Sequence, residues 1–260
     1  MKAIKRIILF RFHDHFDVCL NHIEILKKFN PGIKMYGLYG GSEKDSLKAK
    51  KLPLEHVWSI PLDDPHWKWV NGDLCVRWWF KDFGKKLSFD MLHVIGWDLI
   101  LLKPLEKQFA HMKDGVAITG VLPMAKIYNT WDWVAPKRGR EEWLRLKKYV
   151  TRQFGYRNTP LAGVFGGASM SRKFLERYVR EEIPSWCNDE VRLPLFAQSF
   201  KMPVHDTKLR SKFFIASGHK IFSPAAVYKN FQKGVSVFHP IKESLKLSII
   251  LKIKNSPTFI

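Results

Sequence analysis

The stretch "MLHVIGWDLILLKP", residues 91–104, holds two apolar runs separated by Gly-Trp-Asp. Short apolar runs bounded by turn residues are typical of buried strands, so we predict strands over 91–95 and 99–102. A carboxylate between buried strands is costly unless it is paired or bound to a metal, and Gly96 would allow a tight turn or the close approach of a ligand. Asp98 is therefore a candidate ligand for Mg²⁺ or Mn²⁺, and the alternative is an ion pair with a lysine.

The first 60 residues alternate between strand and helix patterns. We predict strands over 4–10, 33–39 and 56–60, and a helix over 16–29 that the "NPG" after it ends. Strands joined by short links and covering helices are typical of a parallel sheet in an α/β domain. The segments that follow these strands should border a ligand crevice.

The rest of the chain continues this pattern without repeats or a Gly/Ser linker. We predict further strands over 115–119 and 235–242, and helices over 71–86, 140–154 and 188–200. Either Asn188 or Asp189 is expected to cap the last of these helices. One domain over 1–242 is the economical interpretation, followed by a basic, apolar tail over 243–260. That tail is expected to be a helix that lies on a membrane surface or covers the core.

The charge of the chain predicts a polyanionic partner. Lysine and arginine number 44 against 24 acidic residues, which gives a formal net charge of +20. Nucleic acid, an anionic membrane face and phosphorylated small molecules are the candidate classes. Three cysteines without CxxC spacing indicate a reducing compartment. No apolar run approaches the roughly 20 residues of a transmembrane helix, so we expect a cytoplasmic protein, either free or peripheral on the inner face of a membrane.

The 91–104 stretch resembles the core of nucleotide-sugar glycosyltransferases with the GT-A fold. Their pattern is a hydrophobic strand, an Asp-x-Asp or Glu-x-Asp element and a short strand with an apolar-Pro ending. Here the element is Gly96-Trp97-Asp98, so the last acid is present and glycine replaces the first. The resemblance implies a GT-A-like (Rossmann-like), mixed and mostly parallel sheet flanked by helices, with Trp97 and Asp98 in the donor site. It leaves open a one-carboxylate metal site or metal-independent binding.

Two later stretches resemble the same family in the same order. "VFGGASMSRKFLERYV" (164–179) resembles the segment that lines the acceptor and sugar pocket, which implies a role for Gly166 and Gly167; the alternative is close packing of strand and helix. "WCNDEVRLPLFAQ" (186–198) resembles a helix start with an acid that faces the sugar. Asp189 and Glu190 are thus the candidate catalytic residues, one as a general base or sugar-binding acid and the other as a helix cap.

The stretch "VFHPIK" (237–242) resembles the family's late metal and diphosphate segment. The resemblance implies that His239 completes the metal site and that Lys242 contacts the diphosphate. Imidazole is an acceptable ligand for Mn²⁺ and a poorer one for Mg²⁺. The alternative is that His239 is an ordinary polar residue.

Four other polar residues are candidates for donor binding. Arg11 and His13 follow the first strand, in "FRFHDHFD" (10–17), where a nucleotide-base wall is expected. Asp73 and Arg77 are four residues apart on the predicted 71–86 helix, on one face and able to pair. In similar enzymes this helix passes beside the nucleotide, and the alternative is a surface ion pair.

These patterns together predict a glycosyltransferase that moves a sugar from a nucleotide-diphosphate donor to a hydroxyl of a saccharide, glycolipid or protein glycan. A divalent ion, Mn²⁺ or Mg²⁺, and basic residues would stabilise the leaving diphosphate. Surface-polysaccharide or glycan synthesis is the expected setting, with no specific nucleic acid as partner. The alternative is a non-catalytic module that binds nucleic acid or another polyanion through basic residues and aromatic platforms. Its candidate aromatics look buried: Trp67, Trp69, Trp78 and Trp79. Neither GxGxxG nor GxxxxGK[ST] is present.

Overall fold

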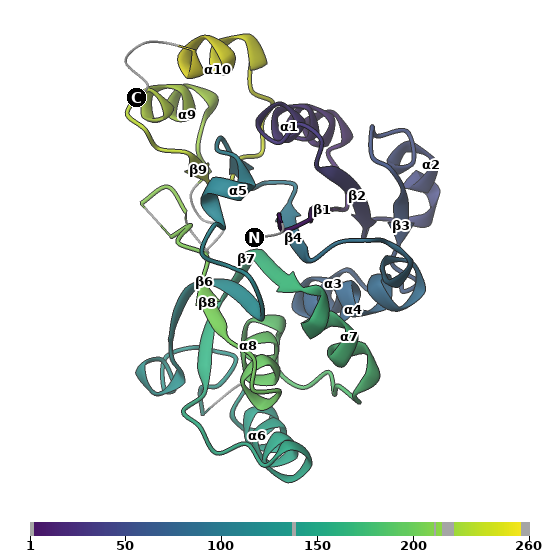
Figure 1. Cartoon of the computed structure of the whole chain (residues 1–260), viewed down its shortest axis with the longest axis vertical. Helices are drawn as coiled ribbons and strands as arrows, with labels where there is room; N and C mark the ends of the chain where they lie inside the picture. The colour runs from purple at the N-terminus through teal and green to yellow at the C-terminus, as the bar shows by residue number, and fades with distance from the viewer. Residues whose placement is uncertain (1–2, 137–138, 211, 215–220, 256–260) are drawn as a thin grey trace. The chain divides into compact units, whose positions relative to one another are not determined.

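Figure 1 shows a computed structural model of the chain, which describes residues 3–136, 139–210, 212–214 and 221–255. Its strands are β1 (Arg6–Phe12), β2 (Lys34–Tyr39), β3 (Val57–Ser59), β4 (Met91–Gly96), β5 (Ile100–Leu101), β6 (Val116–Pro123), β7 (Leu161–Ser171), β8 (Val204–Asp206) and β9 (Val237–Phe238). Its α-helices are α1 (Phe16–Phe29), α2 (Ser46–Ala49), α3 (Pro65–Val70), α4 (Gly72–Asp82), α5 (Leu105–Gln108), α6 (Arg140–Phe154), α7 (Arg172–Arg180), α8 (Asp189–Ser199), α9 (Pro224–Phe231) and α10 (Leu247–Lys254).

One seven-stranded sheet has the strand order β3-β2-β1-β4-β7-β6-β8. The pairings β1–β2, β2–β3 and β6–β8 are parallel, whereas β4–β7 and β6–β7 are antiparallel. The prediction of a mixed, mostly parallel sheet flanked by helices is confirmed. The strands predicted over 91–95 and 99–102 both exist, but they belong to different sheets, because β5 pairs with β9 in a separate two-stranded sheet.

The chain divides into two compact units, and β1 and β4 each contribute to both. Unit 1 contains residues 1–6, 60–93 and 112–207, and unit 2 contains residues 7–59, 94–111 and 208–260. In unit 1, α8 packs on β7, and α4 packs against α7. In unit 2, α1 packs beside β5, and α9 and α10 lie side by side (Figure 1).

Helix α1 has the bounds that its apolar spacing predicts. Cys19, Ile23 and Leu26 recur at helical intervals and are fully buried. The helix ends at Asn30, whose side-chain amide donates to the carbonyl oxygen of Leu26 at 2.9 Å. Because proline follows at position 31, the chain cannot continue the helix.

Helix α10 lies within the predicted tail and covers part of the core of unit 2. Ile250 and Ile253 are buried in a cluster with Phe29, Val227 and Phe231. Leu247 and Ile249 pack against the same cluster and are partly buried. Whether the tail also contacts a membrane surface stays a prediction. Residues 256–260 of the predicted tail lie outside the described part of the chain.

Candidate functional site

In unit 2, the backbone segments that follow β1 and β2 approach each other closely. His13 follows β1, and Gly41 follows β2. A Cβ atom added to Gly41 would lie 2.1 Å from the carbonyl oxygen of His13, so only glycine fits here. This is the carboxyl edge of parallel strands, where open α/β sheets bind ligands.

The Trp97 side chain is fixed at this edge. Its ring stacks on His15 with centroids 4.7 Å apart at 21°, and His13 meets it edge-on at 5.6 Å. The Trp97 amide donates to the carbonyl oxygen of Arg11 at 2.9 Å. Only 7% of Trp97 is exposed, so the indole acts as a wall of this edge.

Asp98 and His239 lie close together, although 140 positions separate them in the chain. His239 Nε2 is 3.6 Å from Asp98 Oδ2, and both side chains are partly exposed, 17% and 24%. The His239 ring stacks on Phe214 at 4.9 Å, and the amide of Ile241 donates to the carbonyl oxygen of Asp98 at 2.8 Å. The segments that carry the two predicted metal ligands are therefore joined by backbone as well as by side chains.

Glycine at position 96 leaves room for the Asp98 carboxylate. The turn is closed by the Leu99 amide, which donates to the carbonyl oxygen of Gly96 at 3.0 Å. A Cβ atom at position 96 would lie 3.1 Å from Asp98 Oδ1, which is tighter than an ordinary van der Waals contact. A second acid at this position would crowd the first.

The Asp98–His239 pair fits one divalent ion in chemistry and spacing. Two neighbouring ligands of an octahedral ion, each about 2.1 Å from it, lie about 3 Å apart, close to the observed 3.6 Å. One carboxylate and one imidazole suit Mn²⁺ better than Mg²⁺. Among the described residues no group of three or more His, Cys, Asp or Glu side chains could hold a metal, so the remaining ligands would come from substrate and water. The metal role of both residues stays a prediction.

The other residues predicted for donor binding in unit 2 differ in exposure. His13 is exposed and pairs with Asp14, with His13 Nε2 3.2 Å from Asp14 Oδ1. Arg11 is half-buried, and Lys242 is exposed, three positions after His239. Their contacts with a nucleotide stay predictions.

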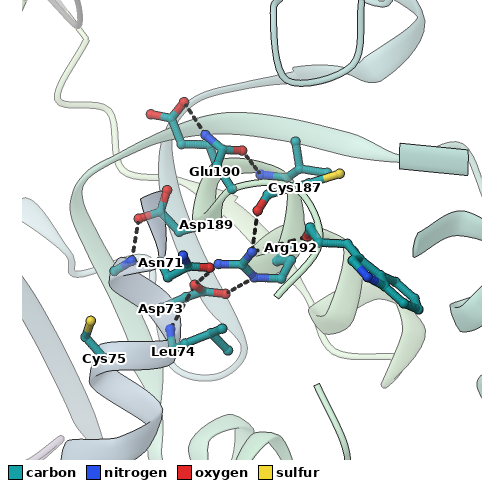
Figure 2. Close-up of polar contacts among 12 residues, drawn as sticks. Asn71, Asp73, Leu74, Cys75, Cys187, Asp189, Glu190 and Arg192 are labelled. Carbon is teal, nitrogen blue, oxygen red and sulfur yellow. Dashed lines mark hydrogen bonds and ion pairs between the residues drawn. The ribbon is translucent and has the colours of Figure 1, made fainter. Parts of the chain in front are cut away.

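In unit 1, Asp73 is enclosed by other protein groups, as Figure 2 shows for its contact with Arg192. Asp73 Oδ1 accepts hydrogen bonds from the Leu74 amide at 2.8 Å and from Arg192 at 2.6 Å. Asp73 Oδ2 accepts from the Tyr178 hydroxyl at 2.6 Å and from Arg192 Nε at 3.0 Å. The Asp73 and Arg192 side chains are fully buried, and burial raises the pKa of Tyr178 well above its usual value.

The expected pairing of Asp73 with Arg77 is wrong. Arg77 donates instead to the carbonyl oxygens of Tyr178, Val179 and Glu181, at 2.8 to 3.2 Å. The last carbonyls of a helix have no partner within it, and the end of α7 presents such groups to Arg77. Roles for Asp73 and Arg77 in donor binding stay predictions.

Asn188, and neither of the two acids after it, caps α8. Its side-chain oxygen accepts from the Val191 amide at 3.2 Å. Asp189 instead accepts from the amide of Gly72, the first residue of α4, at 3.1 Å (Figure 2). This carboxylate satisfies one of the amides that a helix start leaves unpaired, and it is buried.

Glu190 is the partly exposed acid of the pair. Its Oε1 accepts from the Phe165 amide at 3.2 Å, and its Oε2 accepts from the Asn188 side chain at 3.2 Å. Burial raises the pKa of Glu190 to about 7, which suits a group that exchanges protons near neutral pH. Phe165 directly precedes Gly166 and Gly167, so the structure brings the two sequence-based assignments together on β7 and α8. Both assignments stay predictions.

The aromatic side chains near α3 and α4 are not uniformly buried, which corrects one expectation. Trp79 is fully buried, but Trp69 is 62% exposed. Trp67 and Trp78 stack on each other with centroids 4.9 Å apart. On α3 the buried side chain is that of Lys68, and Trp69, the next residue, is turned toward solvent.

Three residues around these sites were missed by the sequence-based reasoning. Arg192 and Tyr178 enclose Asp73 from 119 and 105 positions away, and no local pattern signals such a partner. His22 bonds the backbone beside Asp98. Its signal was available, because a polar residue stands on the buried face of α1.

No family model matches the chain, and no curated protein is similar to it in sequence. The chain is similar in structure to glycosyltransferases. One is the glucosyl-3-phosphoglycerate synthase of Mycobacterium tuberculosis, solved with Mn²⁺, uridine diphosphate and glucosyl-3-phosphoglycerate: 13% identity, TM-score 0.41, covering 79% of this chain and 70% of the other. Another is mouse xyloside xylosyltransferase 1 in its apo form: 8% identity, TM-score 0.43, covering 91% and 98%. At these scores the likeness assigns no residue a role, and the proposals below rest on the chain's own side chains.

Helices of the described part of the chain are all too short or too polar to cross a bilayer.

Proposed function

We propose that this protein transfers a sugar from a nucleotide-diphosphate donor to a hydroxyl acceptor. The observation that carries the proposal is the 3.6 Å approach of His239 Nε2 to Asp98 Oδ2. It lies beside the fixed Trp97 ring, in the unit whose parallel strands end at this edge. A carboxylate and an imidazole that are close enough to bind one ion suit the metal-bound diphosphate of a nucleotide. An aromatic side chain beside them, at the carboxyl edge of the sheet, suits the flat base of the same nucleotide.

Asp98 and His239 would hold the ion, Mn²⁺ or Mg²⁺, which when bound neutralises charge on the diphosphate. Asp98 supplies a charged oxygen ligand, and His239 supplies a nitrogen ligand that is held by its stack on Phe214. Trp97, Arg11 and His13 would contact the nucleotide. Lys242, which is exposed, would approach the phosphates, where a positive charge stabilises a departing nucleoside diphosphate.

Glu190 would accept the proton of the acceptor hydroxyl. A base works best when its pKa lies near the working pH, and the pKa of Glu190 is about 7 because of burial. The partly exposed Glu190 side chain bonds the amide before Gly166, so a sugar on this part of β7 would meet its carboxylate. Asp189 would act only indirectly, because it holds the start of α4.

The acceptor class we favour is one carried on an anionic surface. Residues 208–260 contain ten lysine or arginine residues and one acidic residue, Glu243. The described lysines of α9 and α10 are exposed. Each basic residue near an anionic membrane contributes about 1 kcal/mol of attraction, so glycolipid acceptors and peripheral membrane contact are part of the proposal.

Binding of UDP, GDP and dTDP, each with and without Mn²⁺, tests the donor site by thermal shift. One diphosphate with Mn²⁺ should raise Tm more than either component alone, since ligand at 100 times its Kd stabilises by about 2.7 kcal/mol. Asp98→Asn and His239→Gln should abolish the joint shift. Asp63→Asn, which changes an exposed carboxylate elsewhere, should keep it.

Two results would contradict the proposal. One is a wild-type protein that no nucleoside diphosphate stabilises, but that binds a single-stranded oligonucleotide in a salt-dependent manner. The other is an Asp98→Asn protein with the wild-type response to Mn²⁺ and UDP. Once the diphosphate that binds is known, its release from the corresponding nucleotide sugars is measured in the presence of candidate glycolipids. This measurement tests the transfer of the sugar itself.

A further inference from the structure

His22 is a buried polar residue on α1 whose two ring nitrogens both lie close to backbone carbonyl oxygens. Its Nδ1 lies 2.6 Å from the carbonyl oxygen of Trp97, and its Nε2 lies 3.2 Å from the carbonyl oxygen of Glu243. Both carbonyls can only accept, so a ring nitrogen bonds its carbonyl only where it carries a proton. Burial lowers the pKa of His22, and the single N–H of the neutral ring is assigned by the shorter contact to Nδ1.

The two carbonyls belong to the segments that carry the proposed metal ligands. Trp97 directly precedes Asp98, and Glu243 comes four residues after His239. Asn21, the neighbour of His22, bonds the second segment twice: its amide donates to the Leu245 carbonyl oxygen at 2.9 Å, and its oxygen accepts from the Leu245 amide at 2.7 Å. Two consecutive side chains of one helix therefore hold both segments.

We propose that His22, supported by Asn21, is a positioning residue that keeps the Asp98 turn and the segment after His239 in the arrangement that binds the donor. This inference rests on the function proposed above. The proposal gives neither residue a contact with the donor. His22 is fully buried. Groups that orient metal ligands through backbone or hydrogen bonds typically affect metal affinity by about 10–100-fold when they are removed.

A histidine is not required at this place for packing alone. A buried apolar side chain of similar size would fill the same space, but it would leave the Trp97 carbonyl without its donor. The turn at 96–99 then keeps its backbone bonds, from Trp97 to Arg11, from Leu99 to Gly96 and from Ile241 to Asp98, but no side-chain bond from α1. A carboxylate on such a turn would occupy several positions, and its affinity for an ion would fall.

Amide hydrogen exchange in the metal-free protein tests the positioning directly. In His22→Phe, the amides of Leu99 and Ile241 should exchange at least tenfold faster than in the wild type. His22→Gln, which keeps one N–H donor, should restore part of the protection. The matched control is Asn30→Ala, which removes a comparable bond at the other end of α1, where Asn30 accepts from the Leu105 amide at 2.8 Å. It should leave Leu99 and Ile241 unchanged.

Titration calorimetry with UDP and Mn²⁺ gives the second measurement. Affinity should fall about tenfold in His22→Phe, less in His22→Gln, and not in Asn30→Ala. If His22→Phe does not fold, Asn21→Ala takes its place, with faster exchange at Leu245 as the expected result.

The failure of this inference differs from the failure of the proposed function. Unchanged exchange at Leu99 and Ile241 in both His22 variants overturns the positioning role, whatever binds. The role is also overturned if the His22 variants exchange faster but bind UDP and Mn²⁺ as tightly as the wild type, provided that Asp98→Asn loses binding. A wild type that binds none of UDP, GDP and dTDP in the presence of Mn²⁺ counts against the function and leaves the exchange result to decide whether His22 holds the turn.

Discussion

Asp73 in unit 1 and Asp98 in unit 2 are carboxylates in opposite circumstances. Asp73 is fully buried, and Arg192, Tyr178 and the Leu74 amide occupy both of its oxygens. Asp98 keeps 24% of its side chain exposed and faces one imidazole at 3.6 Å. The first acid is satisfied within the protein. The second is partly exposed, and this contrast distinguishes a carboxylate that holds the fold from one that we propose as a ligand for the donor's metal ion.

Removal of one partner from the Asp73–Arg192 pair should have the largest effect on stability. Arg192→Met leaves the Asp73 charge buried without its partner, so the free energy of unfolding should fall by about 3–5 kcal/mol. Urea denaturation at pH 7 measures it. The double variant Asp73→Leu/Arg192→Met should recover part of this loss, and a single variant within 1 kcal/mol of wild type would show that the pair does not stabilise the fold.

Glu190 should lie between Asp73 and Asp98 in its effect on stability, and the pH dependence of stability should show this effect. Its pKa is about 7 in the folded protein against 4.5 for the free side chain, so the folded state binds the proton more tightly. This contribution is fully present below pH 4.5 and is lost as pH rises through 7. It amounts to about 3 kcal/mol at most, since one pKa unit corresponds to about 1.4 kcal/mol.

Thermal unfolding of Glu190→Gln between pH 4.5 and 8 checks this behaviour. The variant cannot ionise at this position, so its Tm should fall less than that of the wild type over this interval. Glu106→Gln, at an exposed position, should follow the wild type. Parallel curves for Glu190→Gln and wild type would mean that the pKa of Glu190 is not raised.

Asp98→Asn should have the smallest effect on stability. Partly exposed ion pairs contribute about 0–1 kcal/mol, so the free energy of unfolding should change by less than about 1 kcal/mol in the absence of metal. Urea denaturation under the conditions used for Arg192→Met gives the comparison. A loss of 3 kcal/mol would place Asp98 with Asp73 among the carboxylates that hold the fold.

Local patterns predicted the elements of this fold better than their partners. Apolar spacing gave α1 and α6 their observed bounds, because one buried face determines a helix. Pairing of β5 with β9 depends on residues more than a hundred positions away, which periodicity does not encode. The expected Asp73–Arg77 pair failed for the same reason: tertiary partners at the end of α7 and on α8 outweigh a neighbour one turn along.

For the site residues too, local patterns indicated the residue better than its partners. Asp98 was visible as a charge between apolar runs, and the structure does place His239 beside it. The capping of α8 by Asn188 and the bond of Asp189 to Gly72 separate two adjacent acids that the sequence could not distinguish. His22 shows the limit most clearly: its place on the apolar face of α1 was visible, but the atoms it contacts belong to the backbone and have no sequence signature.

The bonds of α1 also set an order of events during synthesis. Leu245 follows its partner Asn21 by 224 residues, which at 5–20 residues per second is a delay of roughly 10–45 s. In the part of this interval that follows the synthesis of Asp98, the emerging chain has the residues of the 96–99 turn without the segment that Asn21 binds. A ribosome stalled before residue 245 would therefore carry a nascent chain that lacks these two bonds, so the proposed site could take its final arrangement only after residue 245 is made.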